Sequence, residues 1–161
     1  MVERMPVIAL RPVEDADLDT LFDQMRDPEA VRMAAFTVED PDDRDAFDAH
    51  MARVRNTPGI THRTITCDGQ VVGSIASFAS GDQTEITYWI DRAAWGRGIA
   101  SQALGLLLTL VPVRPLHARA ASDNIASLRV LEKAGFLIVG TEYSYASARN
   151  HEIEETILRL E

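Results

Sequence analysis

The two most informative segments of this chain are WGRGIA at residues 95–100 and NIASLRVLEKAGF at residues 124–136. The first is a short glycine turn that opens an apolar helix, and the second has the pattern of another helix, which ends at Gly135. Glycines let backbone N–H groups approach a ligand closely, and the start of a helix carries about half a positive charge. The first segment is therefore suited to hold an anion such as a phosphate.

Two other phosphate-binding motifs do not fit the glycine turn. A P-loop needs four residues between a glycine and Gly-Lys-Ser/Thr, and no such segment is present. A dinucleotide fingerprint needs a third glycine where Ser101 stands, and an acidic residue about 20 positions later, which residues 116–119 do not supply. Two interpretations remain, a pyrophosphate site of another type and a plain tight turn that binds nothing.

Hydrophobic periodicity divides the rest of the chain into strands and helices. Asp15 and Asp40 can each cap a helix, and Pro28 is expected to end the first helix, with residues 29–39 irregular. We expect strands at residues 7–11, 61–67, 71–78, 84–90, 116–120, 136–147 and 151–160, and helices at residues 15–27, 41–55, 98–111 and 124–134. This order predicts an α/β (α+β) fold in a single domain, residues 1–161. Its one sheet is expected to be mixed and mostly antiparallel, with about seven strands flanked by about four helices.

The acidic composition limits the possible partners. The net charge is −9 at pH 7, whereas nucleic acids and anionic membranes bind basic patches, so we expect neither as a partner. The charge suits a cationic substrate such as an amine, or it serves solubility alone. Cys67 is the only cysteine, so no intrachain disulfide can form and a cytoplasmic location is expected. The four histidines show no metal-ligand spacing, so we expect no metal.

Together the two segments resemble the acetyl-CoA site of the GNAT acetyltransferases. Gly98 and Ala100 match the end of the family's Gln/Arg-x-x-Gly-x-Gly/Ala turn, and residues 124–136 match Asn-x-x-Ser-x-x-x-Leu-Glu-Lys-x-Gly-Phe. Trp95 replaces the usual Gln or Arg, which is typical of the branch that acetylates protein N-termini, including those of ribosomal proteins. The resemblance implies a GNAT-like fold and acetyl-CoA as cosubstrate. It also implies that the pyrophosphate lies on the backbone amides of Gly96, Arg97, Gly98, Ile99 and Ala100.

For the second segment the resemblance implies two further roles. Asn124 would contact the pantetheine arm, although an Asn at a helix start is also a good N-cap, and both roles cannot easily share one carbonyl. Ser127 would protonate the leaving thiolate, although a solvated serine would look the same in the sequence. In other branches a tyrosine four residues later donates this proton, and here that position is Leu131.

The resemblance assigns further residues to the strand at 84–90 and to the acceptor pocket. In the family this strand carries a bulge whose open backbone groups pair with pantetheine, which points to Trp89 and Ile90. A Glu near its start often serves as the base, and Glu85 fits, although most strand carboxylates are merely exposed. The implied acceptor-pocket walls are Met33, Phe36, Tyr143 and Tyr145, for which core packing is the alternative.

The implied reaction is direct acetyl transfer from acetyl-CoA to a primary amine, either a protein N-terminal α-amine or a small-molecule amine. The main alternative is a non-catalytic acyl-CoA-binding or regulatory domain that has kept the fold. A dinucleotide-binding oxidoreductase is a more distant one. A homodimer is a possible assembly.

Overall fold

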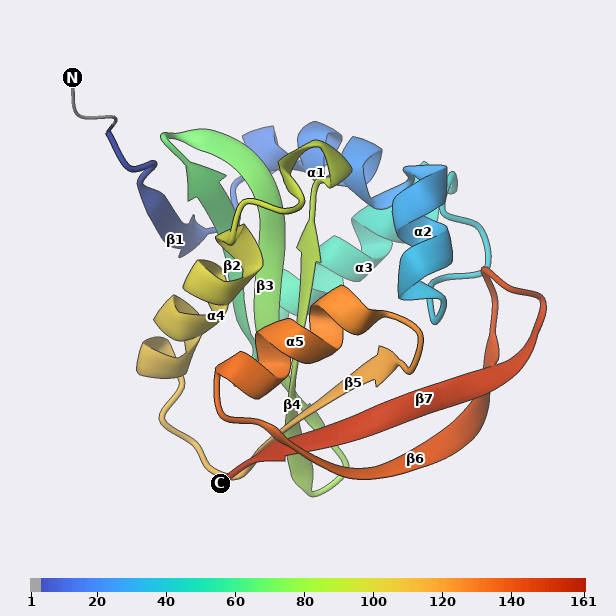
Figure 1. Cartoon of the computed structure of the whole chain (residues 1–161). Coiled ribbons are helices and arrows are strands. Elements are labelled where there is room, and N and C mark those ends of the chain that lie inside the picture. Colours follow the sequence, from blue (N-terminus) through green and yellow to red (C-terminus); the bar gives the residue numbers. More distant parts are fainter. Residues whose placement is uncertain (1–3) are drawn as a thin grey trace.

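The computed structural model describes residues 4–161, so the first three residues of the expected domain lie outside the described part. Seven strands form one sheet in the order β1-β2-β3-β4-β5-β7-β6 (Figure 1). Only β4 and β5 pair in parallel. The strands are β1 (Ile8–Pro12), β2 (Thr61–Cys67), β3 (Gln70–Ser80), β4 (Gln83–Ile90), β5 (Leu116–Ala121), β6 (Leu137–Ala146) and β7 (His151–Leu160). The prediction of one mixed, mostly antiparallel sheet is confirmed.

The described chain has five α-helices rather than about four. They are α1 (Leu18–Met25), α2 (Pro28–Ala34), α3 (Arg44–Asn56), α4 (Ile99–Leu110) and α5 (Ile125–Lys133). The additional helix is α2, in a region expected to be irregular. Pro28 does not simply end α1; it is the first residue of α2, and the Asp27 side chain caps this helix by accepting a hydrogen bond from Ala30 N at 3.0 Å. A proline suits this position because the first helical N–H has no partner within the helix.

Two expected helix starts are displaced. Asp15 opens a 3₁₀ turn, η1 (Asp15–Asp17), whose N-cap is Glu14. The helix expected at residues 41–55 is α3, which begins after Asp43 rather than Asp40. The Asp43 carboxylate accepts a hydrogen bond from Ala46 N at 3.0 Å. Several aspartates stand close together at each start, and backbone geometry selects the one that caps. None of the helices within residues 4–161 has the length and apolar character needed to cross a membrane.

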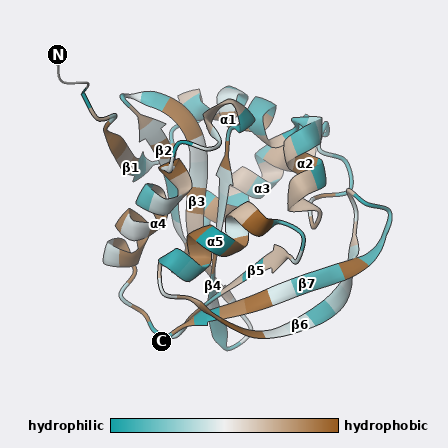
Figure 2. Ribbon diagram, viewed as in Figure 1, coloured by the Kyte–Doolittle hydropathy of each residue, from teal (hydrophilic) through white to brown (hydrophobic). Residues whose placement is uncertain are grey.

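Helices cover both faces of the sheet (Figure 1). The larger core lies between the sheet and the pair α4 and α5, where Leu104, Leu107 and Leu131 pack against strand residues such as Ile75 and Ile86. The hydrophobic residues of α4 and β3 are brown in Figure 2. On the opposite face, a smaller cluster joins α1 and α3 to the sheet.

The feature that positions the site is the divergence of β4 from β5. The two strands pair only through Thr84↔Leu116 and Glu85↔His117, so residues 86–90 of β4 have no strand partner on that side. The bulge expected in this strand is absent, because the register between β3 and β4 is regular from Ser80↔Gln83 to Gly73↔Ile90. The open backbone groups that the bulge was expected to supply come instead from the separation of the two strands.

Candidate active site

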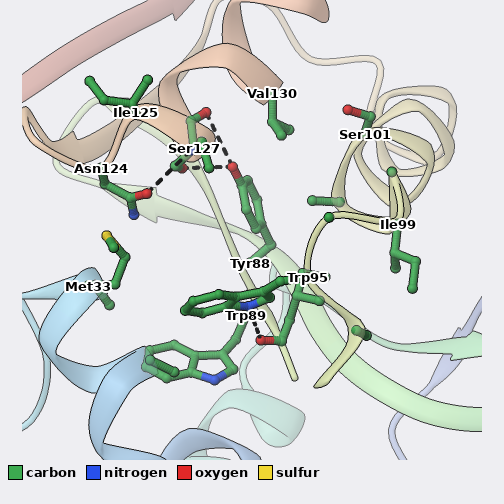
Figure 3. Close-up of a pocket in the computed structure, with 18 of the residues that line it drawn as sticks. Met33, Tyr88, Trp89, Trp95, Ile99, Ser101, Asn124, Ile125, Ser127 and Val130 are labelled. Atoms are coloured by element: carbon green, nitrogen blue, oxygen red, sulfur yellow. Dashed lines mark hydrogen bonds between the residues drawn. The ribbon is translucent and has the colours of Figure 1, made fainter. Parts of the chain in front are cut away.

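A cavity of about 490 Å³ lies against the end of β4 that has no strand partner, between the starts of α4 and α5. It is walled by the end of β4, by α2, by the turn at residues 94–98 and by the starts of α4 and α5 (Figure 3). Nine residues predicted for the site line it, namely Met33, Trp89, Ile90, Gly96, Gly98, Ile99, Ala100, Asn124 and Ser127. Within residues 4–161, no group of three or more His, Cys, Asp or Glu side chains is arranged to hold a metal ion. A volume of this size suits a small-molecule ligand.

The glycine turn forms one end of the cavity. Gly96 and Gly98 have φ angles of +76° and +75°, which glycine adopts without steric cost. The indole N–H of Trp95 donates a hydrogen bond of 2.9 Å to the carbonyl of Ile90, which ties the turn to the end of β4. Gly98 is the N-cap of α4, and no side chain caps this helix. Its first N–H groups therefore remain for an anion.

Arg97 lies in the turn but does not line the cavity. Its side chain is exposed and its guanidinium lies 3.8 Å from the sulfur of Cys67. Within residues 4–161 it has no carboxylate partner within 4.0 Å. The side chain is thus placed beside the turn, outside the cavity.

Asn124 caps α5, and the structure shows how this leaves part of its amide free. Its side-chain oxygen accepts a hydrogen bond of 3.3 Å from Ser127 N. The carbonyl is thus used within the protein, while the NH₂ group of the same amide remains as a donor toward the cavity that Asn124 lines. The cap and a ligand contact therefore use different atoms and do not compete.

Ser127 contacts a residue that sequence reasoning missed. Its Oγ lies 2.7 Å from the hydroxyl oxygen of Tyr88, a β4 residue that also lines the cavity (Figure 3). Burial raises the pKa of Tyr88, and the hydrogen bond with Ser127 acts in the opposite direction. In the sequence, strand alternation puts Tyr88 on the same face as Ile86 and Ile90. A phenol on an otherwise apolar face is the signal by which this residue could have been found.

A second missed residue, Gly73, supports the end of β4 from behind. A Cβ atom at Gly73 would lie 2.0 Å from the carbonyl oxygen of Trp89. The indole N–H of Trp89 donates a hydrogen bond of 3.2 Å to the carbonyl of Gln24, which joins α1 to β4. The end of β4 is thus held by its pairing with β3 and by the contact of the Trp89 side chain with α1.

Glu85 does not line the cavity. Its carboxylate accepts a hydrogen bond of 3.1 Å from Nε of Arg119. Arg119 also binds Glu142, and it binds Glu155 at 3.1 Å. Glu85 therefore belongs to a network of one arginine and three carboxylates across β4, β5, β6 and β7, and its role as the base stays a prediction.

The structure separates the four residues expected to form the acceptor pocket. Met33 lines the cavity, whereas Phe36 packs against a small cluster formed by Ala35, Ala121 and Ala146. Tyr143 and Tyr145 lie on β6 with 68% and 61% of their surface exposed, and neither lines the cavity. Their roles in acceptor binding stay predictions.

An ion pair between Asp123 and Arg149 lies at the cavity wall just before α5. Asp123 is the one lining residue within the described chain whose side chain is ordinarily charged. The Arg149 guanidinium binds its carboxylate at 2.8 and 3.2 Å, and this hydrogen bonding lowers the pKa of Asp123. Arg149 also donates a hydrogen bond of 2.8 Å to the carbonyl of Arg32, which connects α2 to the β6–β7 turn.

Three solved structures illustrate the fold that this chain shares. A ribosomal-protein-alanine N-acetyltransferase from Brucella melitensis is 22% identical, with 94% of this chain and 98% of that chain covered and a TM-score of 0.80. A spermidine N-acetyltransferase from Vibrio cholerae, in complex with CoA and spermine, is 14% identical, with coverages of 95% and 94% and a TM-score of 0.81. A Salmonella typhimurium structure that contains acetyl-CoA is 20% identical, with coverages of 96% and 93% and a TM-score of 0.76. At these identities the likeness shows the fold alone.

The family itself follows from the sequence match. No curated protein sequence matches the chain. Residues 8–137, however, match the family model of the acetyltransferase (GNAT) domain. This match includes the whole glycine turn and all of α5, and it confirms the resemblance expected from these two segments. The chain belongs to the GNAT family and is an acetyl-CoA-dependent acetyltransferase.

Proposed function

We propose that the chain transfers the acetyl group of acetyl-CoA to a primary amine by direct attack of the amine on the thioester. The observation that carries this proposal is the cavity beside the end of β4, which joins the uncapped start of α4 to the hydroxyl groups of Tyr88 and Ser127. One end is suited to an anion and the other to hydrogen bonding of a leaving group. The unpartnered edge of β4 lies between the two ends.

Within this site we assign the binding groups as follows. The backbone N–H groups of residues 96–100 would hold the pyrophosphate, and the free edge of β4 at Trp89 and Ile90 would pair with the pantetheine arm as an added strand does. The NH₂ group of Asn124 would donate to the same arm. Ser127 would donate a hydrogen bond to the departing sulfur. The bound cosubstrate supplies the activated acetyl group.

The charge distribution favours a weakly basic acceptor. Within the described chain, the cavity is lined by no histidine and by no carboxylate free of an ion pair, since Asp123 is bound to Arg149. An acceptor must lose its proton before it attacks. At pH 7 this costs about 1.4 kcal/mol for an α-amine of pKa about 8, and about 4.6 kcal/mol for a lysine of pKa about 10.4. We therefore favour an N-terminal α-amine of a peptide, with a small-molecule amine as the second candidate.

We also propose Glu85 as the base, with intervening water. Its carboxylate lies on β4 but outside the cavity, and Arg119 holds it at 3.1 Å. Glu85→Gln tests this role, because it removes the basic group and keeps the side-chain shape. A base role predicts that kcat falls while the acetyl-CoA Kd is unchanged. An unchanged kcat would mean that Glu85 is not the base and that its role is confined to the ion pair with Arg119.

The experiment that tests the function follows release of the CoA thiol in the presence of different acceptors. A peptide with a free N-terminus is compared with the same peptide blocked at its N-terminus, and with spermidine. Turnover with the free peptide but not the blocked one would support an α-amine acceptor. Turnover with spermidine would support a small-molecule acceptor. Binding of acetyl-CoA with no turnover on a wider panel of amines would favour the non-catalytic alternative.

For assembly we propose a homodimer through β6. This strand is at the edge of the sheet, and Leu137, Ile138 and Val139 at its start are exposed. Figure 2 colours hydrophobic residues of this kind brown. An exposed apolar edge strand pairs readily with another chain. Sedimentation equilibrium of wild type and Ile138→Lys tests this proposal, because a charge at this edge should shift the mass toward the monomer.

We also propose a cytoplasmic location, which suits a chain with a single cysteine.

A further inference from the structure

Two hydroxyl groups from distant parts of the chain meet in the cavity, between β4 and the start of α5. The Tyr88 phenol comes from β4 and the Ser127 hydroxyl from α5, and their oxygens are 2.7 Å apart. The phenol oxygen also lies 3.5 Å from the carbonyl oxygen of Ser127. Figure 3 shows both side chains directed toward each other beside Asn124. The contact links the opened edge of the sheet to the first turn of α5.

Beside the NH₂ group of Asn124, which we assign to the pantetheine arm, these two hydroxyl groups are the donors placed to stabilise a thiolate here. The described residues that line the cavity include no Lys, Arg or His, and the one carboxylate is paired with Arg149. The third hydroxyl in the lining belongs to Ser101, in the first turn of α4 beside the glycine turn. A negative charge that develops in an apolar cavity must be met by donors already in place.

We propose that Tyr88 is a positioning residue for Ser127. The phenol O–H donates to Oγ of Ser127, and this fixes the serine O–H as a donor toward the sulfur where the carbon–sulfur bond breaks. This inference rests on the proposed function. The amine nitrogen forms its bond to the carbonyl carbon, the carbon–sulfur bond breaks, and the electron pair of the broken bond goes to sulfur. Overall the amine loses one proton and the thiol gains one. Neither hydroxyl is consumed.

The direction of the hydrogen bond follows from the chemistry of the two groups. A phenol, with an ordinary pKa of about 10, is a stronger acid and a better donor than an aliphatic alcohol. Burial raises the pKa of Tyr88, which keeps the phenol protonated at neutral pH. Leu131, at the position where other branches of the family place a tyrosine, is 1% exposed and packs in the core. The phenol of this site therefore comes from the sheet rather than from α5.

The test measures the thiol pKa of bound CoA and needs no acceptor. CoA carrying ¹³C at the carbon bonded to sulfur is titrated by NMR on wild type, Tyr88→Phe, Ser127→Ala and the double variant. A hydrogen bond to a charged group stabilises by enough to shift a pKa by about one unit or more. We expect the bound thiol pKa to rise by about one unit in each single variant, and by no more than that in the double variant. Ser80→Ala, at an exposed serine at the end of β3, is the matched control and should not move it.

The outcomes separate this inference from the proposed function. A thiol pKa that is unchanged in Tyr88→Phe, with CoA bound, would overturn the role of Tyr88. Shifts that add in the double variant would also overturn it, because the two hydroxyls would then act independently. Absence of CoA binding to wild type would refute the cofactor site itself. Ser127→Ala leaves β4 untouched, so it tests the donor to sulfur even if Tyr88→Phe folds poorly. Turnover gives a second readout, since kcat should fall at least tenfold in Tyr88→Phe at an unchanged KM for acetyl-CoA.

Discussion

Gly73→Ala should displace the edge of β4 proposed to bind the cofactor, without replacing any residue that lines the cavity. An ideal Cβ at Gly73 would lie 2.0 Å from the carbonyl oxygen and 3.0 Å from the carbonyl carbon of Trp89, and 3.2 Å from Cα of Ile90. All three are backbone atoms. No change of rotamer can relieve these contacts, so the strands themselves must move apart.

The size of the effect follows from these distances. A comfortable contact between such atoms is about 3.5 Å, so the Trp89 carbonyl must move by roughly 1.5 Å. Overpacking of this kind costs about 1–3 kcal/mol of unfolding free energy. For a chain of this size we expect Tm to fall by roughly 2–12 °C. A displacement of about 1 Å at a reacting group costs about 100-fold in rate, so we expect kcat/KM to fall by about two orders of magnitude.

The assay combines calorimetric binding of acetyl-CoA, thermal unfolding and thiol release on wild type, Gly73→Ala and Gly105→Ala. Gly105 is the matched control, because it lies exposed on α4, outside the left-handed region, with no atom within 4 Å of its ideal Cβ. Alanine in a helix interior is favoured over glycine by about 0.5–1 kcal/mol, so this control should be slightly more stable and fully active.

The result that would refute this reasoning is a Gly73→Ala protein with wild-type acetyl-CoA affinity and wild-type turnover. It would mean that the position of the Trp89 carbonyl does not matter for the cofactor. A lower Tm with unchanged acetyl-CoA affinity would mean that Gly73 serves the packing of the two strands and not the cofactor site. Loss of activity in Gly105→Ala as well would show that the assay responds to any added methyl group.

Three further predictions concern a cap, a buried carboxylate and a surface cation. Asn124→Asp keeps the oxygen that caps α5 and loses the NH₂ donor, so Tm should be preserved while acetyl-CoA binds about tenfold more weakly; Asn124→Ala should lose both, with about 1 kcal/mol of stability. The Arg11 guanidinium lowers the pKa of buried Asp17 to about 2, below its unfolded value of about 3.9, so the stabilisation of about 2 kcal/mol is complete above about pH 5 and is lost progressively as the pH falls to about 1. Urea unfolding should therefore show a large deficit for Asp17→Asn at pH 7 that shrinks below about pH 5, and a deficit independent of pH would contradict the ion-pair explanation. Arg97→Ala removes an exposed cation beside the turn that we propose holds the pyrophosphate. The KM for acetyl-CoA should therefore rise, with kcat unchanged, and it should rise more at low than at high ionic strength because salt screens an exposed charge.

Local patterns were sufficient for the types and order of most elements. The alternation of residues 61–67 and 84–90 and the glycine turn before α4 each depend on neighbours within one or two turns of chain, so they can be recognised without the fold. The errors at Pro28 and Asp40 have the same local origin. A proline can follow one helix or begin the next, and only the cap that Asp27 gives to Ala30 shows which applies.

By itself the sequence determined the glycine turn that opens α4 and the position of Asn124 at the start of α5, because both are properties of contiguous residues. The tertiary structure alone decided the rest of the site. Tyr88 meets Ser127 across 39 positions, and Gly73 makes room for the carbonyl of Trp89 on the neighbouring strand. It also showed that Glu85 is bound to Arg119 rather than facing the cavity. These contacts depend on strand order and on the point where β4 leaves β5, which no short window of sequence encodes.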